Sequence, residues 1–144
     1  MSVWLPSGLY SFIERVSDLF ELVVFTAATQ DIADPVIDTI DPNKRIIHRL
    51  YRESCVNVGS LFVKDLDLLG RAPESTVIID NSPSCYMLQP DQAIPIESWF
   101  QDADDHELQT LIPLLEELAA SDEDVSTALA RLVPKPLSRW GGHQ

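Results

Sequence analysis

The sequence predicts an α/β fold with a largely parallel sheet. Segments of helical and strand character alternate along the 144 residues. A composition of 45% hydrophobic and 23% charged residues is typical of a globular domain with its own core. The run Val77-Ile78-Ile79 reads as a buried strand, and Asp80 and Asn81 follow at its carboxyl end. In open α/β sheets ligands bind at that edge, so these two residues are the first candidates for a site.

The first half of the chain contains two predicted helix–strand units. Apolar residues at helical spacing predict a helix over residues 9–19, with Ser7 as its N-cap. A buried strand over residues 21–25, a helix over 30–40 and a strand over 46–51 follow in that order. Pro35 is compatible with its helix only if it lies in the first turn. Asp41-Pro42-Asn43 is a strong turn signal between the second helix and strand.

The second half predicts shorter elements. We expect a hairpin over residues 55–63 around Gly59, a short helix after Lys64 that stops near Gly70, the strand at 77–79, a short helix over 84–87 and an edge strand over 93–96. A leucine stripe predicts a helix over 107–118, in which Pro113 should bend or shift the axis, and a last helix covers 124–132. We find no repeat or linker, so residues 1–132 form one domain and 133–144 a flexible tail.

Charge and composition exclude several classes of function. The formal net charge of −13 argues against direct binding of nucleic acid or of anionic membranes. No apolar run approaches the roughly 20 residues that a membrane-spanning helix needs. Two cysteines and the absence of a secretory signal indicate a reducing, intracellular compartment. Without a visible transit peptide, a nuclear or cytoplasmic location is favoured over a mitochondrial one.

Three predicted strands end in groups that could bind phosphate and Mg²⁺. Thr26 follows the first strand, Lys64 follows the hairpin, and Asp80-Asn81 follow the third run. A hydroxyl and an ammonium can hold phosphate oxygens, and the acid and amide are oxygen ligands that suit Mg²⁺. Each residue also has a simpler interpretation: a strand end, a surface lysine or an Asx turn. Arg52 is either half of a phosphate clamp or one member of a surface ion pair.

The other candidate motifs are weaker. The Asp-x-Asp pairs at 65–67 and 102–104 are better explained as helix caps. The three histidines lack partners at zinc-ligand spacing, and Cys55 reads as a small buried apolar residue. There is no P-loop, GxGxxG or GxSxG motif.

Taken together, these blocks resemble the small C-terminal-domain phosphatases and the Dullard-like phosphatases of the haloacid dehalogenase superfamily. The resemblance runs over nearly the whole chain, and its most specific parts are Arg-Glu-Ser-Cys at 52–55 and Asp-Asn-Ser-Pro at 80–83. The other matching blocks lie at residues 21–27, 33–36, 63–66 and 93–100. A related mitochondrial import-receptor subunit shares the fold but fits these blocks less well.

The resemblance implies a three-layer Rossmann-like fold with a small hairpin insertion, and it assigns roles to the candidate residues. Thr26 would bind phosphate, and Lys64 would stabilise the phosphoryl group. Asn81 would bind Mg²⁺ directly, with Asp80 supporting the metal shell. Arg52 would lie near the substrate phosphate.

Two departures from the family pattern limit what the resemblance implies. Ile32 occupies the place of a tyrosine that lines a substrate pocket, which weakens the expectation of a polymerase-tail substrate. The Asp-x-Asp-x-Thr motif of the first, central strand is absent from the printed sequence, so we expect a truncated domain without its nucleophile. If the neighbouring strands close that gap, Val24 and Ile78 should lie about 5 Å apart, and if a hole remains, about 10 Å apart.

Two hypotheses about function follow. The first is a Mg²⁺-dependent phosphatase domain for phosphoserine or phosphothreonine in proteins, including the RNA polymerase II tail, which is inactive as this chain. The second is a non-catalytic phosphopeptide-binding or scaffold module, including an import-receptor-like subunit.

Overall fold

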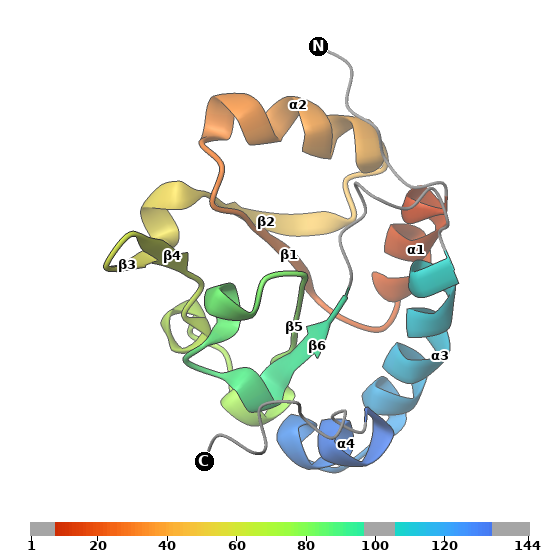
Figure 1. Cartoon of the computed structure of the whole chain (residues 1–144). Helices are drawn as coiled ribbons and strands as arrows, with labels where there is room; N and C mark the ends of the chain where they lie inside the picture. The colour runs from red at the N-terminus through yellow and green to blue at the C-terminus, as the bar shows by residue number, and fades with distance from the viewer. Residues whose placement is uncertain (1–7, 97–105, 134–144) are drawn as a thin grey trace.

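The computed structural model describes residues 8–96 and 106–133 and has helices packed around short, mostly parallel strands (Figure 1). The helices are α1 (Leu9–Val16), α2 (Gln30–Ile40), α3 (His106–Ala120) and α4 (Val125–Leu132). The strands are β1 (Leu22–Phe25), β2 (Ile46–Leu50), β3 (Val56–Val58), β4 (Leu61–Val63), β5 (Ile78–Asp80) and β6 (Ala93–Pro95). Helices α1, α3 and α4 gather on one side, and α2 lies apart from them beside β2 (Figure 1). The predicted α/β class is confirmed.

The strands form three separate pairs. β1 pairs with β2 and β5 with β6, both in parallel, and β3 and β4 form an antiparallel hairpin. The hairpin and the edge position of β6 match the predictions from Gly59 and Pro95. Within the part of the chain that the structure describes, no backbone pairing joins β1 to β5. The two parallel pairs, β1–β2 and β5–β6, are therefore not hydrogen-bonded to each other through β1 and β5.

One apolar core holds both parallel pairs against the same helices. The predicted leucine stripe of α3 faces this core, and Leu115 is almost completely buried. Residues from both strand pairs pack against the cluster. They are Leu22, Ile46, Val77 and Ile79. Because a parallel sheet needs an apolar cover, the three helices give the strands a common support.

Two helices contain a proline, and the position of Pro35 differs from our expectation. Pro35 is the sixth residue of α2, not part of its first turn, so that prediction is wrong. Buried Ala33 and Ile37 pack on either side of it, which offsets the one hydrogen bond that proline removes. Helix α3 likewise runs through Pro113, because buried leucines hold it before and after this position.

Some predictions on element ends are also corrected or fall outside the description. α1 ends at Val16, three residues earlier than predicted, and the chain continues in turns whose N–H groups at Leu19 and Phe20 donate to Val16 O. Its N-cap is Gly8, with a φ of 86° that favours glycine. The predicted cap Ser7, most of the tail and residues 97–100 of the last motif block lie outside the described residues. No described helix has the length and apolar character to cross a membrane.

An exposed ion pair links the two strand pairs at their amino ends. Arg71, in the loop before β5, donates two hydrogen bonds to Glu21, just before β1, at 2.7 and 2.8 Å. This hydrogen bonding holds the pKa of the Glu21 carboxyl below its usual value. The ionised form of Glu21 is therefore more stable in the folded chain than in the unfolded chain.

We predict that Arg71→Gln raises the pKa of Glu21 towards 4.5, its ordinary value. Because the folded-state pKa is lowered, the stabilisation is complete above the unfolded value and is lost as the pH falls through the folded value. The thermal midpoint of the variant should therefore fall less steeply with acidification than that of the native chain. NMR titration of the carboxyl carbons tests this. Glu123, whose pKa is lowered by Arg131 on α4, is an internal control that should not change.

Candidate functional site

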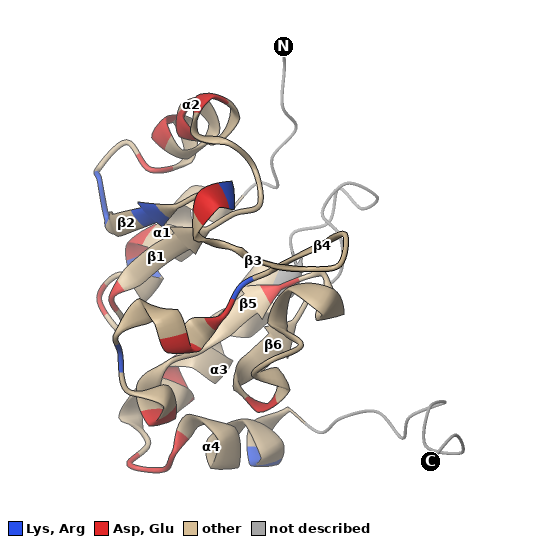
Figure 2. Ribbon diagram, turned by 90° about the vertical axis from the view of Figure 1, so that its left-hand side faces the viewer, with Lys and Arg blue, Asp and Glu red and all other residues tan. Residues whose placement is uncertain are grey.

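A buried ion pair joins two of the predicted site residues. Lys64 Nζ lies 2.5 Å from Asp80 Oδ2, and the two side chains are only 10% and 9% exposed. Figure 2 shows a basic and an acidic segment meeting in the region where the hairpin approaches β5. Two strand ends that lie 16 residues apart in the sequence are thus brought into contact, as predicted.

Backbone contacts hold both partners of this pair. Val63 is fully buried, and the N–H of Lys64 donates to Cys85 O at 2.8 Å. Asp80 also accepts a hydrogen bond from the N–H of Ser82 through Oδ1, at 2.9 Å. Both oxygens of Asp80 are therefore engaged, which fixes the orientation of its carboxylate.

Thr26 lies at the carboxyl end of β1, and its side chain is turned back onto its own loop. Its N–H donates to Leu50 O at 2.9 Å, which extends the β1–β2 pairing. Its Oγ1 accepts a hydrogen bond from the N–H of Ala28 at 3.0 Å. A hydroxyl oxygen keeps its own proton for donation, so Thr26 can still donate to an anion at this loop.

Arg52 is tied to the same loop. Its Nε donates to Ala27 O at 2.7 Å, and its guanidinium lies over the ring of Phe62 at 5.0 Å from the centroid. The backbone N–H of Arg52 donates to Ala28 O at 3.0 Å. These contacts hold an exposed cation next to the loop that follows β1.

Cys55 contacts the Thr26 loop, a contact that sequence reasoning missed. Its Sγ lies 3.8 Å from Thr26 O, and the charges of Lys64 and Arg52 act on it. Burial raises the pKa of the Cys55 thiol, and Lys64 opposes that shift. The thiol is half-buried, so it is not the simple core residue that its sequence context predicts. Cys55 is thus in contact with the Thr26 loop, and the convergence of Thr26 with Lys64 and Asp80 stays a prediction.

Asn81 is the most accessible of the candidate metal ligands. It is exposed, and the structure shows no hydrogen bond to its side chain from the residues described. Both oxygens of Asp80 are already taken, and no cluster of three His, Cys, Asp or Glu residues occurs in residues 8–96 and 106–133. The residues fit Mg²⁺ only in part: Asn81 can bind directly, Asp80 can support, and water or phosphate must supply the other ligands.

Two predicted or supporting residues lie further out. Ile32, in the first turn of α2, follows the Thr26 loop and is 55% exposed, and its role in substrate binding stays a prediction. Buried Gln89 accepts a hydrogen bond from the N–H of Leu66 and donates to Asp65, which secures the chain just after Lys64. Nothing in the local sequence distinguishes Gln89 from a surface glutamine, because its partners come from 23 and 24 residues away.

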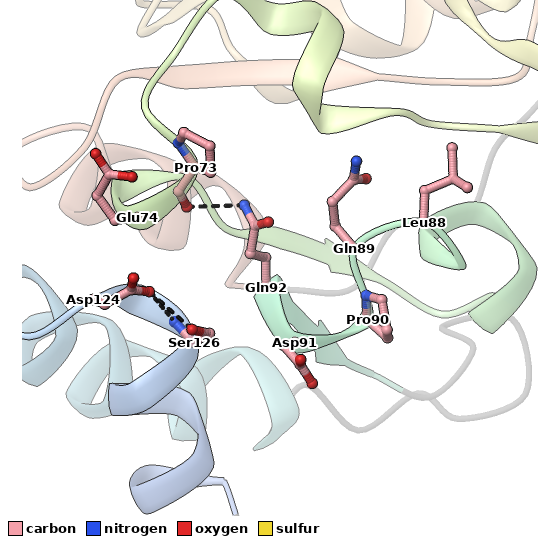
Figure 3. A pocket seen from close by; sticks show the side chains of 9 residues that line it. All are labelled: Pro73, Glu74, Leu88, Gln89, Pro90, Asp91, Gln92, Asp124 and Ser126. Atoms are coloured by element: carbon pink, nitrogen blue, oxygen red, sulfur yellow. Dashed lines mark hydrogen bonds between the residues drawn. The ribbon is translucent and has the colours of Figure 1, made fainter.

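The pocket in Figure 3 contains none of the predicted site residues in its lining. It encloses about 280 Å³ beside the start of α4. Its lining contains three carboxylates and no lysine or arginine, which makes it unsuited to a phosphate. The lining residues are Pro73, Glu74, Leu88, Gln89, Pro90, Asp91, Gln92, Asp124 and Ser126.

We predict that Lys64→Met lowers the free energy of unfolding by about 3 kcal/mol or more, because it leaves a buried carboxylate without its partner. Asp80→Asn should also destabilise, whereas the double variant should lose much less than the sum of both. Denaturant unfolding of the three variants measures this coupling. Strictly additive losses would show that the two charges do not depend on each other.

Comparisons with known proteins identify the family to which the chain belongs. A family model described as "NLI interacting factor-like phosphatase" matches residues 1–126. An uncharacterized protein of Schizosaccharomyces pombe is 52% identical over 122 residues, which are 85% of this chain and 37% of that protein. A probable C-terminal domain small phosphatase of Dictyostelium discoideum is 51% identical over 118 residues, covering 82% and 38% of the two chains.

Further relatives show the same coverage. Mouse carboxy-terminal domain RNA polymerase II polypeptide A small phosphatase 2 is 48% identical over 121 residues, or 84% of this chain and 44% of the relative. The chain thus spans less than half the length of these curated relatives. The solved structure of Fcp1, an essential RNA polymerase II CTD phosphatase, matches with a TM-score of 0.57 and 22% identity. It covers 98% of this chain and 41% of Fcp1, and it supports the fold.

Proposed function

Because the chain belongs to the NLI interacting factor-like phosphatase family, we propose that it binds the phosphate of phosphoserine or phosphothreonine in proteins at the end of β4. The observation that carries this proposal is the buried Lys64–Asp80 ion pair. A lysine ammonium has three N–H donors, and Asp80 occupies one of them. The other two can donate to phosphate oxygens while the carboxylate keeps the ammonium in position.

Thr26 and Arg52 complete the proposed phosphate site from the loop after β1. The Thr26 hydroxyl can donate to the anion, since its oxygen already accepts from Ala28. The guanidinium of Arg52 is held by Ala27 O and the Phe62 ring, so little conformational freedom is lost when it meets a phosphate. The charge of Lys64 is balanced by Asp80, so Arg52 is the residue that would add positive charge to this site, in a chain with net charge −13.

The proposed site also includes a magnesium ion, for which Asn81 would be the direct ligand. Its exposed amide oxygen would hold the ion, and Asp80 would support the shell through its fixed carboxylate. When bound, Mg²⁺ would neutralise part of the charge on the phosphate.

Complete catalysis needs a nucleophilic carboxylate as well. The printed sequence contains no Asp-x-Asp-x-Thr, and Asp80 is neutralised by its ion pair. We therefore expect the chain to bind the phosphorylated residue without hydrolysing it. The phosphatase hypothesis and the hypothesis of a non-catalytic binding module use the same site. They differ only in whether the bound phosphate is hydrolysed. One substrate class to test is a phosphorylated tail of RNA polymerase II, the polymerase in the name of the mouse relative. A nuclear or cytoplasmic location of this chain would match such a substrate.

We predict that Lys64→Gln weakens binding of a phosphoserine peptide by about tenfold or more, since a charge-assisted hydrogen bond contributes about 1.5–3 kcal/mol. Lys44→Gln removes the same charge from the exposed turn after α2 and should change the affinity less than about twofold. Isothermal titration on the purified 144-residue chain measures both. Unchanged binding in Lys64→Gln would rule out this site.

The same preparation tests turnover with Mg²⁺. We expect no phosphate release from the peptide. Phosphate release by the native chain that disappears in the Lys64→Gln variant would contradict the hypothesis of a non-catalytic module. It would show that the chain completes the phosphatase reaction.

Magnesium should strengthen peptide binding in the native chain, and we predict that Asn81→Ala removes this strengthening while leaving metal-free binding largely unchanged. Titrations with and without Mg²⁺ separate the two effects. An equal effect of Mg²⁺ on both proteins would mean that Asn81 is not a ligand.

A further inference from the structure

The segment that carries Lys64 is held by one other stretch of the chain, the residues from Asp80 to Gln89. The side chain of Lys64 contacts Asp80, and its backbone N–H donates to Cys85 O at 2.8 Å. Directly after it, the N–H of Leu66 donates to Gln89 Oε1 at 3.1 Å. The stretch therefore contacts the ammonium, the backbone and the following turn of the lysine segment. Of these three partners, Gln89 is the one that contributes a neutral side chain.

The amide of Gln89 has one orientation that satisfies its surroundings. Its Nε2 donates to Asp65 Oδ1 at 2.7 Å, while its Oε1 accepts from Leu66 N–H. Exchanging the oxygen and the nitrogen would place donor against donor and oxygen against carboxylate. Gln89 is 9% exposed and its contact with Leu66 is buried, so loss of the amide would leave that N–H without this partner inside the protein.

These contacts act on the turn through which the chain leaves Lys64. β4 ends at Val63, so the ladder of the hairpin stops just before the lysine. Asp65 then caps the short 3-10 helix that follows. Because Gln89 holds the capping oxygen of Asp65, it fixes this turn relative to the stretch that supplies the acidic partner of the ion pair. The direction in which the lysine side chain leaves the backbone depends on that turn.

We infer that Gln89 is a positioning residue for Lys64, which keeps the ammonium where its remaining N–H groups can meet a phosphate. The inference rests on the proposed function, since it concerns affinity at the same site. Gln89 would act without contacting the phosphate, through residues 65 and 66. A buried N–H that loses its partner is unfavourable, so the turn would move to regain one, and the pocket that Gln89 lines leaves room for this movement.

Two glutamine variants of the 144-residue chain separate positioning from a general loss of stability. Gln89→Met roughly keeps the size of the side chain but removes both of its hydrogen bonds. Gln92→Met is the matched control, because Gln92 lines the same pocket and also donates two hydrogen bonds, to Pro73 O and Thr76 O. Figure 3 shows both glutamines. Both variants should lower the thermal midpoint. Gln89→Asn, whose shorter amide reaches only one partner, is the milder variant to use if Gln89→Met does not fold.

Isothermal titration with a phosphoserine peptide gives the first result. Gln89→Met should weaken binding by about threefold or more, and Gln92→Met should change it less than about twofold. In a Lys64→Gln background, Gln89→Met should cause no further loss, because it acts through the lysine. Equal weakening by the two glutamine variants, or an additive loss in the double variant, would overturn the inference.

The ammonium group of Lys64 gives a second result that does not need the peptide. Its NMR signal should exchange slowly with water in the native chain, because the ion pair buries it. Gln89→Met should shift this signal and speed its exchange, whereas Gln92→Met should leave it unchanged. An unchanged signal in Gln89→Met would overturn the inference. A shifted signal in a chain that binds no phosphopeptide would support positioning of Lys64 by Gln89 and count against the proposed function alone.

Discussion

The ion pair of Lys64 and Asp80 is the constraint on which the rest of the site depends. Two charges that are about nine-tenths buried are stable only together, because either one alone would lose its hydration without compensation. The pair therefore joins the end of the hairpin to the end of β5. It also fixes the turn that presents Asn81, since the other oxygen of Asp80 accepts from Ser82 N–H. One interaction thus sets the positions of an ammonium, a carboxylate and an amide.

The proposed phosphate site would have to act within an acidic chain. With a net charge of −13, the mean field around the molecule repels phosphate. Within the pair of Lys64 and Asp80 the two charges balance each other, and Arg52, which is held against Ala27 O, adds a cation. For the proposed binding, directed hydrogen-bond donors would therefore matter more than net charge.

Much of the fold could be predicted because its signals are local. The bounds of α2 follow from helical spacing, and the hairpin follows from Gly59, which adopts a φ of 62°. The contact between the ends of β4 and β5 was also predicted, from the polar residues Lys64 and Asp80. Gln89 and Cys55 could not be predicted, because their importance lies in contacts with residues 23 to 29 positions away. Pro35 was misjudged for the same reason, since packing of its helix outweighed the local cost of proline.

The position of the candidate site follows from the direction of the strands. Within each parallel pair the carboxyl ends lie at one edge, and Thr26 and Asp80 stand at such ends, just after β1 and at the end of β5. The hairpin brings a further strand end to β5, where the ion pair of Lys64 and Asp80 joins the two. The polar groups of the site therefore depend on strand ends that different parts of the sequence supply, and the buried pair is the contact that fixes two of them relative to each other.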